Sequence, residues 1–86
     1  MSFKIINVEA ACGTNVGAAS TFNDSTEVRL VNTGSTMRLI TVANAADTTL
    51  GSFTLAPGEV TFIRKNKTDQ VFAAHAEVLG LGIVYQ

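Results

Sequence analysis

Short runs of β-branched and large apolar residues, each closed by a turn of small or polar residues, fill this sequence from end to end. Within a run, apolar and polar residues alternate, as in Glu27 to Asn32, where Val28 and Leu30 share one side. Alternation with a period of two is the pattern of a β-strand that buries one face. No window repeats apolar residues at helical spacing, so the sequence predicts an all-β fold.

The runs predict six or seven short, mostly antiparallel strands in a single β-domain that spans residues 1–86. We expect a small β-sandwich or barrel in which residues 27–65 form a four-stranded meander. Residues 10–21 are almost all small and predict a loop. Residues 70–77 fit either one helical turn or a strand. The expected strands are residues 3–8, 27–32, 36–44, 48–55, 59–65 and 78–85.

Two glycines mark special backbone positions. Pro57-Gly58 predicts a type II turn, because proline presets φ for the first central position and glycine takes the positive φ of the second. Gly51 lies inside an expected strand and predicts a bulge or a close approach.

The strand at residues 36–44 is apolar on both faces, so we expect it to be central or to contact another protomer.

Composition indicates that the domain gains stability by association. A folded chain of 86 residues buries about 60% of its extended surface, and domains of that size often need a disulfide, a metal or a partner. Cys12 is the one cysteine, while His75 stands alone and the acidic residues are scattered singly, so the sequence predicts neither a disulfide nor a metal site. Charged residues make up 15% of the chain, against about 25% in an ordinary soluble domain.

Several function classes find little support. Six basic and seven acidic residues give no basic field for nucleic acid, and the one local cluster is Arg64, Lys65 and Lys67. The N-terminus lacks the apolar core of a signal peptide and no stretch reaches the length of a membrane span, so we expect a protein made in the cytoplasm. Without tryptophan and with one tyrosine, the chain is poorly suited to bind sugars.

No catalytic or cofactor site is predicted. Cys12 and His75 would be the thiolate and base of a nucleophilic pair, but Cys12 lies among small residues, where a free cysteine behaves as a small hydrophobe. Gly13 to Gly17 lacks the Gly-Lys-Ser/Thr of a phosphate-binding loop. The sequence therefore predicts a protein that is not an enzyme and needs no cofactor.

Four short sequence segments along the chain, taken together, indicate a family resemblance. They are residues 5–10 (Ile-Ile-Asn-Val-Glu-Ala), 29–32 (Arg-Leu-Val-Asn), 55–59 (Leu-Ala-Pro-Gly-Glu) and 65–69. Together they resemble small virion structural proteins of marine tailed phages, notably phages of cyanobacteria. The resemblance implies a structural component of a particle, either a capsid decoration (cement) protein or a tail or neck component. We favour decoration of the shell, because a compact β-domain can bridge capsomers.

The expected partners are therefore other copies of this chain and virion proteins such as the major capsid protein, with a trimer as the first expectation. The terminal strands would be docking edges, because their backbone groups lack a neighbour. The alternative from another class is a β-module that binds a glycan or a peptide, and a minimal enzyme ranks last. The candidate assembly contacts are Phe3, Ile5, Met37, Leu39, Ile40, Val42, Leu81, Ile83 and Tyr85.

Overall fold

Eight short strands form two antiparallel sheets in the computed structural model, which describes residues 3–6 and 8–85. The larger sheet has the order β1-β8-β3-β6, with β2 also paired to β8, and the smaller sheet has the order β5-β4-β7. The strands are β1 (Phe3–Ile5), β2 (Ala10–Ala11), β3 (Glu27–Asn32), β4 (Arg38–Ala43), β5 (Thr49–Leu55), β6 (Val60–Arg64), β7 (Gln70–Ala73) and β8 (Val78–Tyr85).

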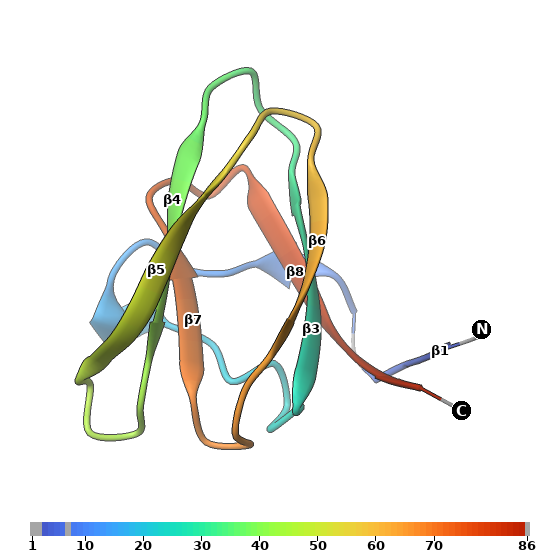
Figure 1. Cartoon of the computed structure of the whole chain (residues 1–86), viewed down its shortest axis with the longest axis vertical. Helices are drawn as coiled ribbons and strands as arrows, with labels where there is room; N and C mark the ends of the chain where they lie inside the picture. Colours follow the sequence, from blue (N-terminus) through green and yellow to red (C-terminus); the bar gives the residue numbers. More distant parts are fainter. Residues whose placement is uncertain (1–2, 7, 86) are drawn as a thin grey trace.

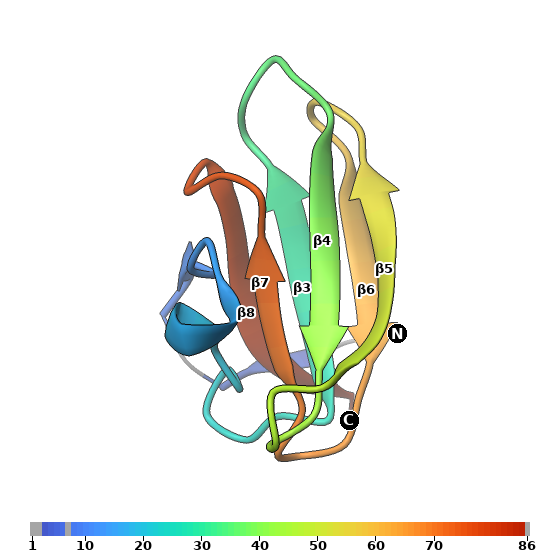
Figure 2. The same cartoon turned by 90° about the vertical axis from the view of Figure 1, so that its left-hand side faces the viewer.

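The two sheets pack face to face, as Figures 1 and 2 show. Each contributes buried side chains to one core, Val28 and Leu30 from β3 and Ile40 and Leu55 from the smaller sheet. The described residues contain no α-helix and one turn of 3-10 helix, η1 (Val16–Ala18). The prediction of a small all-β sandwich or barrel is confirmed, and the structure is a sandwich with eight strands where six or seven were expected.

The path of the chain differs from the expected meander. Both edges of β3 are taken, one by β6 and the other by β8, so β4 cannot pair beside it. Instead the chain crosses to the second sheet after Asn32, forms β4 and β5 there, and returns as β6. Residues 27–65 are therefore divided between two sheets. β4 is the central strand of its sheet, which agrees with its apolar residues on both faces.

The return crossing uses the predicted turn. Gly58 has a φ of 75°, and the Glu59 N–H donates to the Ala56 carbonyl at 3.0 Å, as a type II turn with Pro57 at its first central position requires. The Gly58 N–H also donates to the Asn32 carbonyl at 2.8 Å. The turn is thus fastened to the end of β3.

Glycines in β8 make room for the core. A Cβ on Gly80 would lie 2.7 Å from Cζ of Phe22, and one on Gly82 would lie 1.9 Å from Oγ of Ser25. The larger side chains of β8 point to the opposite face of the sheet, as the alternation predicts. β8 therefore packs by its backbone against the fully buried Phe22.

The N-terminal residues cover one side of the sandwich. β1 and β2 pair with β8, and the segment at residues 13–20 runs along the outer edge of β7. The Ala73 N–H donates to the Gly13 carbonyl at 3.0 Å, while Ser20 and Val71 exchange two backbone hydrogen bonds of 3.0 and 2.9 Å. β7 is thus a strand with both edges paired, and a turn at residues 74–77 follows it.

Candidate functional site

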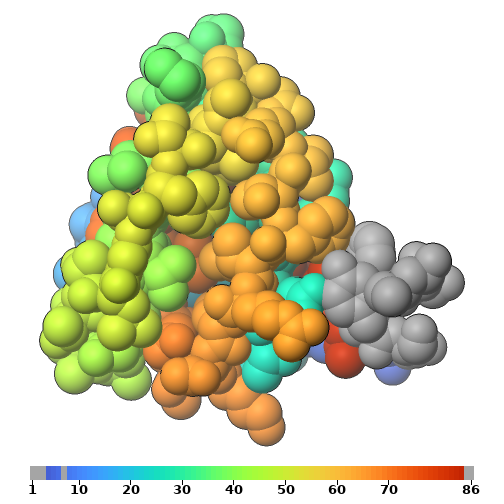
Figure 3. All heavy atoms as spheres, viewed as in Figure 1, coloured from blue at the N-terminus to red at the C-terminus, as the bar shows by residue number. Residues whose placement is uncertain are grey.

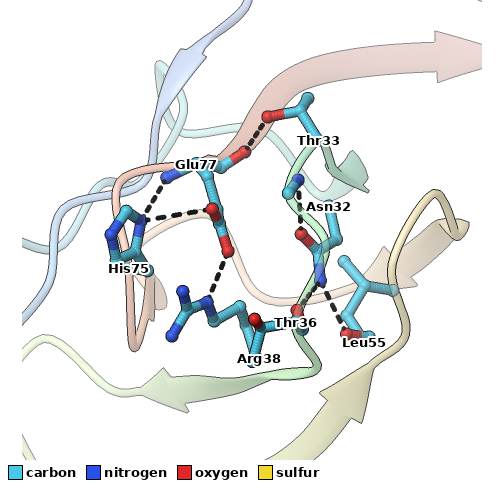
Figure 4. Close-up of polar contacts among 8 residues, drawn as sticks. Asn32, Thr33, Thr36, Arg38, Leu55, His75 and Glu77 are labelled. Atoms are coloured by element: carbon cyan, nitrogen blue, oxygen red, sulfur yellow. Dashed lines mark hydrogen bonds and ion pairs between the residues drawn. The ribbon is translucent and has the colours of Figure 1, made fainter.

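A buried asparagine joins the two sheets at the end of the sandwich where β3 ends (Figure 4). Nδ2 of Asn32 donates to the carbonyls of Thr36 at 2.8 Å and Leu55 at 3.0 Å, and its Oδ1 accepts from the Gly34 N–H at 2.9 Å. Because Leu55 ends β5, this one side chain links the larger sheet to the smaller one.

Glu77 lies beside this link and gathers a second set of bonds (Figure 4). Its carboxylate pairs with Nε of Arg38, which begins β4, and its carbonyl accepts from Oγ1 of Thr33 at 2.6 Å. Its N–H donates to Nδ1 of His75 at 3.1 Å. The described residues contain no buried side-chain nitrogen or oxygen without a partner. The polar atoms of this cluster therefore bond to one another, an arrangement that supports the fold.

Cys12 packs in the hydrophobic core and is 1% exposed. Burial raises the pKa of its thiol to about 12, because the low-dielectric surroundings disfavour the thiolate. The thiol is protonated at neutral pH, so Cys12 fills space as a small hydrophobe, as the sequence predicts. His75 lies in an exposed turn and bonds to Glu77.

The cluster of Arg64, Lys65 and Lys67 does not form a common basic surface. Lys65 is buried, and its Nζ donates to the carbonyls of Asn66 and Lys67, both at 3.3 Å. Burial lowers the pKa of Lys65, and the nearby carboxylate of Asp69 opposes that change. The Arg64 side chain is exposed and lies 3.4 Å from the Glu27 carboxylate. Lys65 therefore supports the turn at residues 66–69.

The described residues contain neither a metal site nor a pocket. No group of three His, Cys, Asp or Glu side chains within residues 3–6 and 8–85 is arranged to hold a metal ion. The described surface contains no detected pocket. None of the helical structure in this part of the chain is long and apolar enough to cross a membrane.

Exposed apolar side chains are the remaining feature, and three of the predicted assembly contacts belong to them. Ile5, Met37 and Leu39 are exposed, with Leu39 lying on the outer face of β4. Phe3 and Tyr85 pair through their backbones at the chain ends, and their side chains lie outside the described residues.

Four other predicted contacts serve the monomer. Ile40 is fully buried in the core and Val42 packs against it, so the inner face of β4 has no surface for a partner. Leu81 and Ile83 point away from the core, yet they are 7% and 1% exposed. These corrections share one reason, because alternation identifies which residues share a face and does not say what covers that face.

The sequence did not predict the exposed apolar residues on β5 and β6, which are edge strands of the two sheets. Leu50 is 56% exposed on β5, and Phe62 is 44% exposed beside Val60 on β6. The sequence did contain a signal for the exposure of Leu50, because the neighbouring Gly51 predicts a bulge. The pairing Val42 with Gly51 is followed by Ala43 with Thr49, which leaves Leu50 as the extra residue.

Known protein families, curated proteins and solved structures contain no match to this chain.

Proposed function

We propose that this chain is a non-enzymatic structural protein of a phage virion, which decorates the capsid and binds both to itself and to the major capsid protein. The supporting observation is the number of large apolar side chains that stay exposed on strands at sheet edges. Leu50 on β5, Val60 and Phe62 on β6, and Ile5 on β1 are each more than 40% exposed. Apolar surface gathered on edge strands is typical of a protein that docks on others.

The charge of the chain supports the same proposal. A net charge of −1 and a low content of charged residues give little electrostatic repulsion between copies. Some of the charged side chains also pair with one another, Arg29 with Glu9 at 2.9 Å and Arg38 with Glu77. Association of copies therefore buries apolar surface without removing many charges from water.

The copy number of the protein in purified particles tests the proposal. Quantitative mass spectrometry should find hundreds of copies per virion, as decoration of the whole shell requires. About a dozen copies or fewer would place the protein in the tail or neck instead. The purified protein should also sediment with empty capsids. A stable monomer at micromolar concentration that binds no particle would overturn the proposal and favour the glycan- or peptide-binding module.

A further inference from the structure

The outer edges of the two sheets differ in what covers them. Residues 13–20 bond along β7, and β1 with β2 bonds along β8. On the other side of the sandwich, β5 pairs with β4 alone and β6 pairs with β3 alone. Figures 1 and 3 show both edge strands on one face of the molecule, close together near the turn that joins them and diverging away from it. One side of the molecule is thus covered by the chain itself, and the other ends in two edge strands.

Of the edge strands longer than two residues, apart from the covered β7, β5 is the one that lacks charge. The seven residues Thr49 to Leu55 include no Asp, Glu, Lys or Arg, whereas β1 carries Lys4 and β6 ends at Arg64. Proteins protect the free edge of a sheet with charges, proline or cover, because an unprotected edge pairs with other strands. A strand that pairs with its own copy must also avoid like charges across the two-fold axis. β5 meets that condition.

Some backbone N–H and C=O groups of β5 point to the edge of the sheet that faces away from β4. The Ala74 N–H donates to the Leu39 carbonyl, so Leu39 and Thr41 direct their backbone groups to β7, and Ile40 directs its groups to β5. Ile40 is opposite Phe53, which therefore bonds to β4. Since backbone groups alternate along an antiparallel strand, those of Ser52 and Thr54 point away from β4 to the open edge.

The side chains of β5 complement themselves in one register. Where two copies pair antiparallel with Ser52 opposite Ser52, Gly51 of each copy stands opposite Phe53 of the other. A Cβ on Gly51 would have no heavy atom within 4 Å, so there is empty space above this glycine. Phe53 is partly exposed and packs on the core beside it. An aromatic ring placed over a glycine on the neighbouring strand is a known way to stabilise an edge pairing.

We propose that two copies of this chain pair antiparallel through β5, with Ser52 at the two-fold axis and Phe53 of each copy over Gly51 of the other. This inference rests on the proposed function, since it names the edge through which the protein binds itself. The pairing makes one six-stranded sheet in the order β7-β4-β5-β5-β4-β7. It also predicts a dimer in place of the trimer expected from the sequence.

Cross-linking through single cysteines tests the register. Directly opposite residues of a hydrogen-bonded pair have Cα atoms about 5.5 Å apart, a distance that a disulfide spans. Ser52→Cys should therefore form a disulfide dimer under mild oxidation. In the matched control Thr54→Cys, the two cysteines would be about 14 Å apart, four residues along the strand, and should cross-link at least ten times more slowly. The native Cys12 is buried and does not compete.

Substitutions that act on the dimer alone give a second test by sedimentation equilibrium. Thr54→Lys puts a charge on the edge and should weaken dimerisation at least tenfold while leaving the thermal unfolding midpoint of the monomer within a few degrees. Gly51→Val has room in the monomer and should weaken dimerisation to a similar extent, because the valine occupies the place of Phe53 from the other copy. Thr14→Lys, in an exposed loop, should change neither property.

The outcomes separate this inference from the proposed function. Preferential cross-linking of Ser52→Cys with weaker dimers of Thr54→Lys supports the β5 pairing. Equal cross-linking rates for Ser52→Cys and Thr54→Cys, in a wild-type protein that self-associates or binds capsids, would overturn the pairing and leave the proposed function standing. A wild-type protein that is monomeric and binds no particle would overturn both.

Discussion

The clearest test of how the two sheets are held together is the replacement of Asn32. Its side chain is fully buried and makes three hydrogen bonds, to the carbonyls of Thr36 and Leu55 and from the Gly34 N–H. Asn32→Ala removes all three bonds. The Leu55 carbonyl is then left in the core without this donor, whereas Thr36 and Gly34 are near enough to the surface to bond to water.

The expected loss is large for a domain of this size. An unsatisfied buried group costs about 1 to 3 kcal/mol, and each of the two bonds nearer the surface adds about 0.5 to 1.5 kcal/mol. Asn32→Ala should thus lower the free energy of unfolding by about 2 to 6 kcal/mol. A chain of 86 residues has roughly 4 to 13 kcal/mol in total. Asn66→Ala, at an exposed position, should change it by less than about 0.5 kcal/mol.

Asn32→Asp adds a pH dependence with a defined sign. The new carboxyl keeps the shape of the amide but faces two carbonyl oxygens in a buried place, so its folded-state pKa should be raised above the unfolded value of about 3.9. The folded state then binds more protons, and the variant loses stability relative to the wild type as the pH rises from about 4 toward the folded-state pKa. Urea titrations monitored by circular dichroism at pH 4, 6 and 8 measure this difference. A difference that stays constant over that range, or an Asn32→Ala variant as stable as Asn66→Ala, would refute the role assigned to Asn32.

Three further substitutions or treatments test other parts of the fold. Gly58→Val should destabilise the domain by more than about 1 kcal/mol in urea titrations, because valine is strained at a φ of 75°, and a neutral result would contradict the type II turn. Gly80→Ala should cost about 1 to 3 kcal/mol, since its Cβ would lie 2.7 Å from Phe22, and an unchanged thermal midpoint would show that the ring can move aside. Cys12 should react with iodoacetamide only on unfolding, and the free energy of unfolding should fall as the pH rises above 9.0, where the unfolded thiol ionises and the buried thiol, with its pKa of about 12, does not. Rapid labelling of the native protein at pH 8 would contradict the buried position.

Local pattern was enough to predict six of the eight strands of this fold, all but β2 and β7. The strand at residues 27–32 has the predicted bounds, the Pro57-Gly58 turn has the predicted conformation, and the bulge lies beside Gly51. These features depend on neighbouring residues, through alternation and through the φ angles that proline and glycine favour. The helix-or-strand choice at residues 70–77 was left open, because its outcome depends on β4 and on the segment at residues 13–20, which are distant in sequence.

The arrangement of the strands was harder to predict. The meander prediction placed β4 beside β3, since consecutive strands usually pair, but β3 already has β6 and β8 as neighbours. Which sheet a strand joins depends on pairings between distant residues, and a single sequence does not display them. The same difficulty affected the prediction of which residues contact a partner. Ile40 and Leu39 both belong to an apolar strand, yet one is fully buried and the other is 49% exposed.

The position of the N-terminal segment explains why the two sides of the sandwich differ. Residues 13–20 are small enough to lie flat along β7, and their backbone groups satisfy the edge of that strand without adding charge or bulk. With β7 and β8 both covered, the smaller sheet can extend only through β5. A larger residue at position 51 would improve the β-propensity of that strand, but it would also fill the space above Gly51. An uncharged edge strand, whose glycine would lie opposite the phenylalanine of a second copy, is therefore better suited to pairing with that copy than to remaining exposed to water.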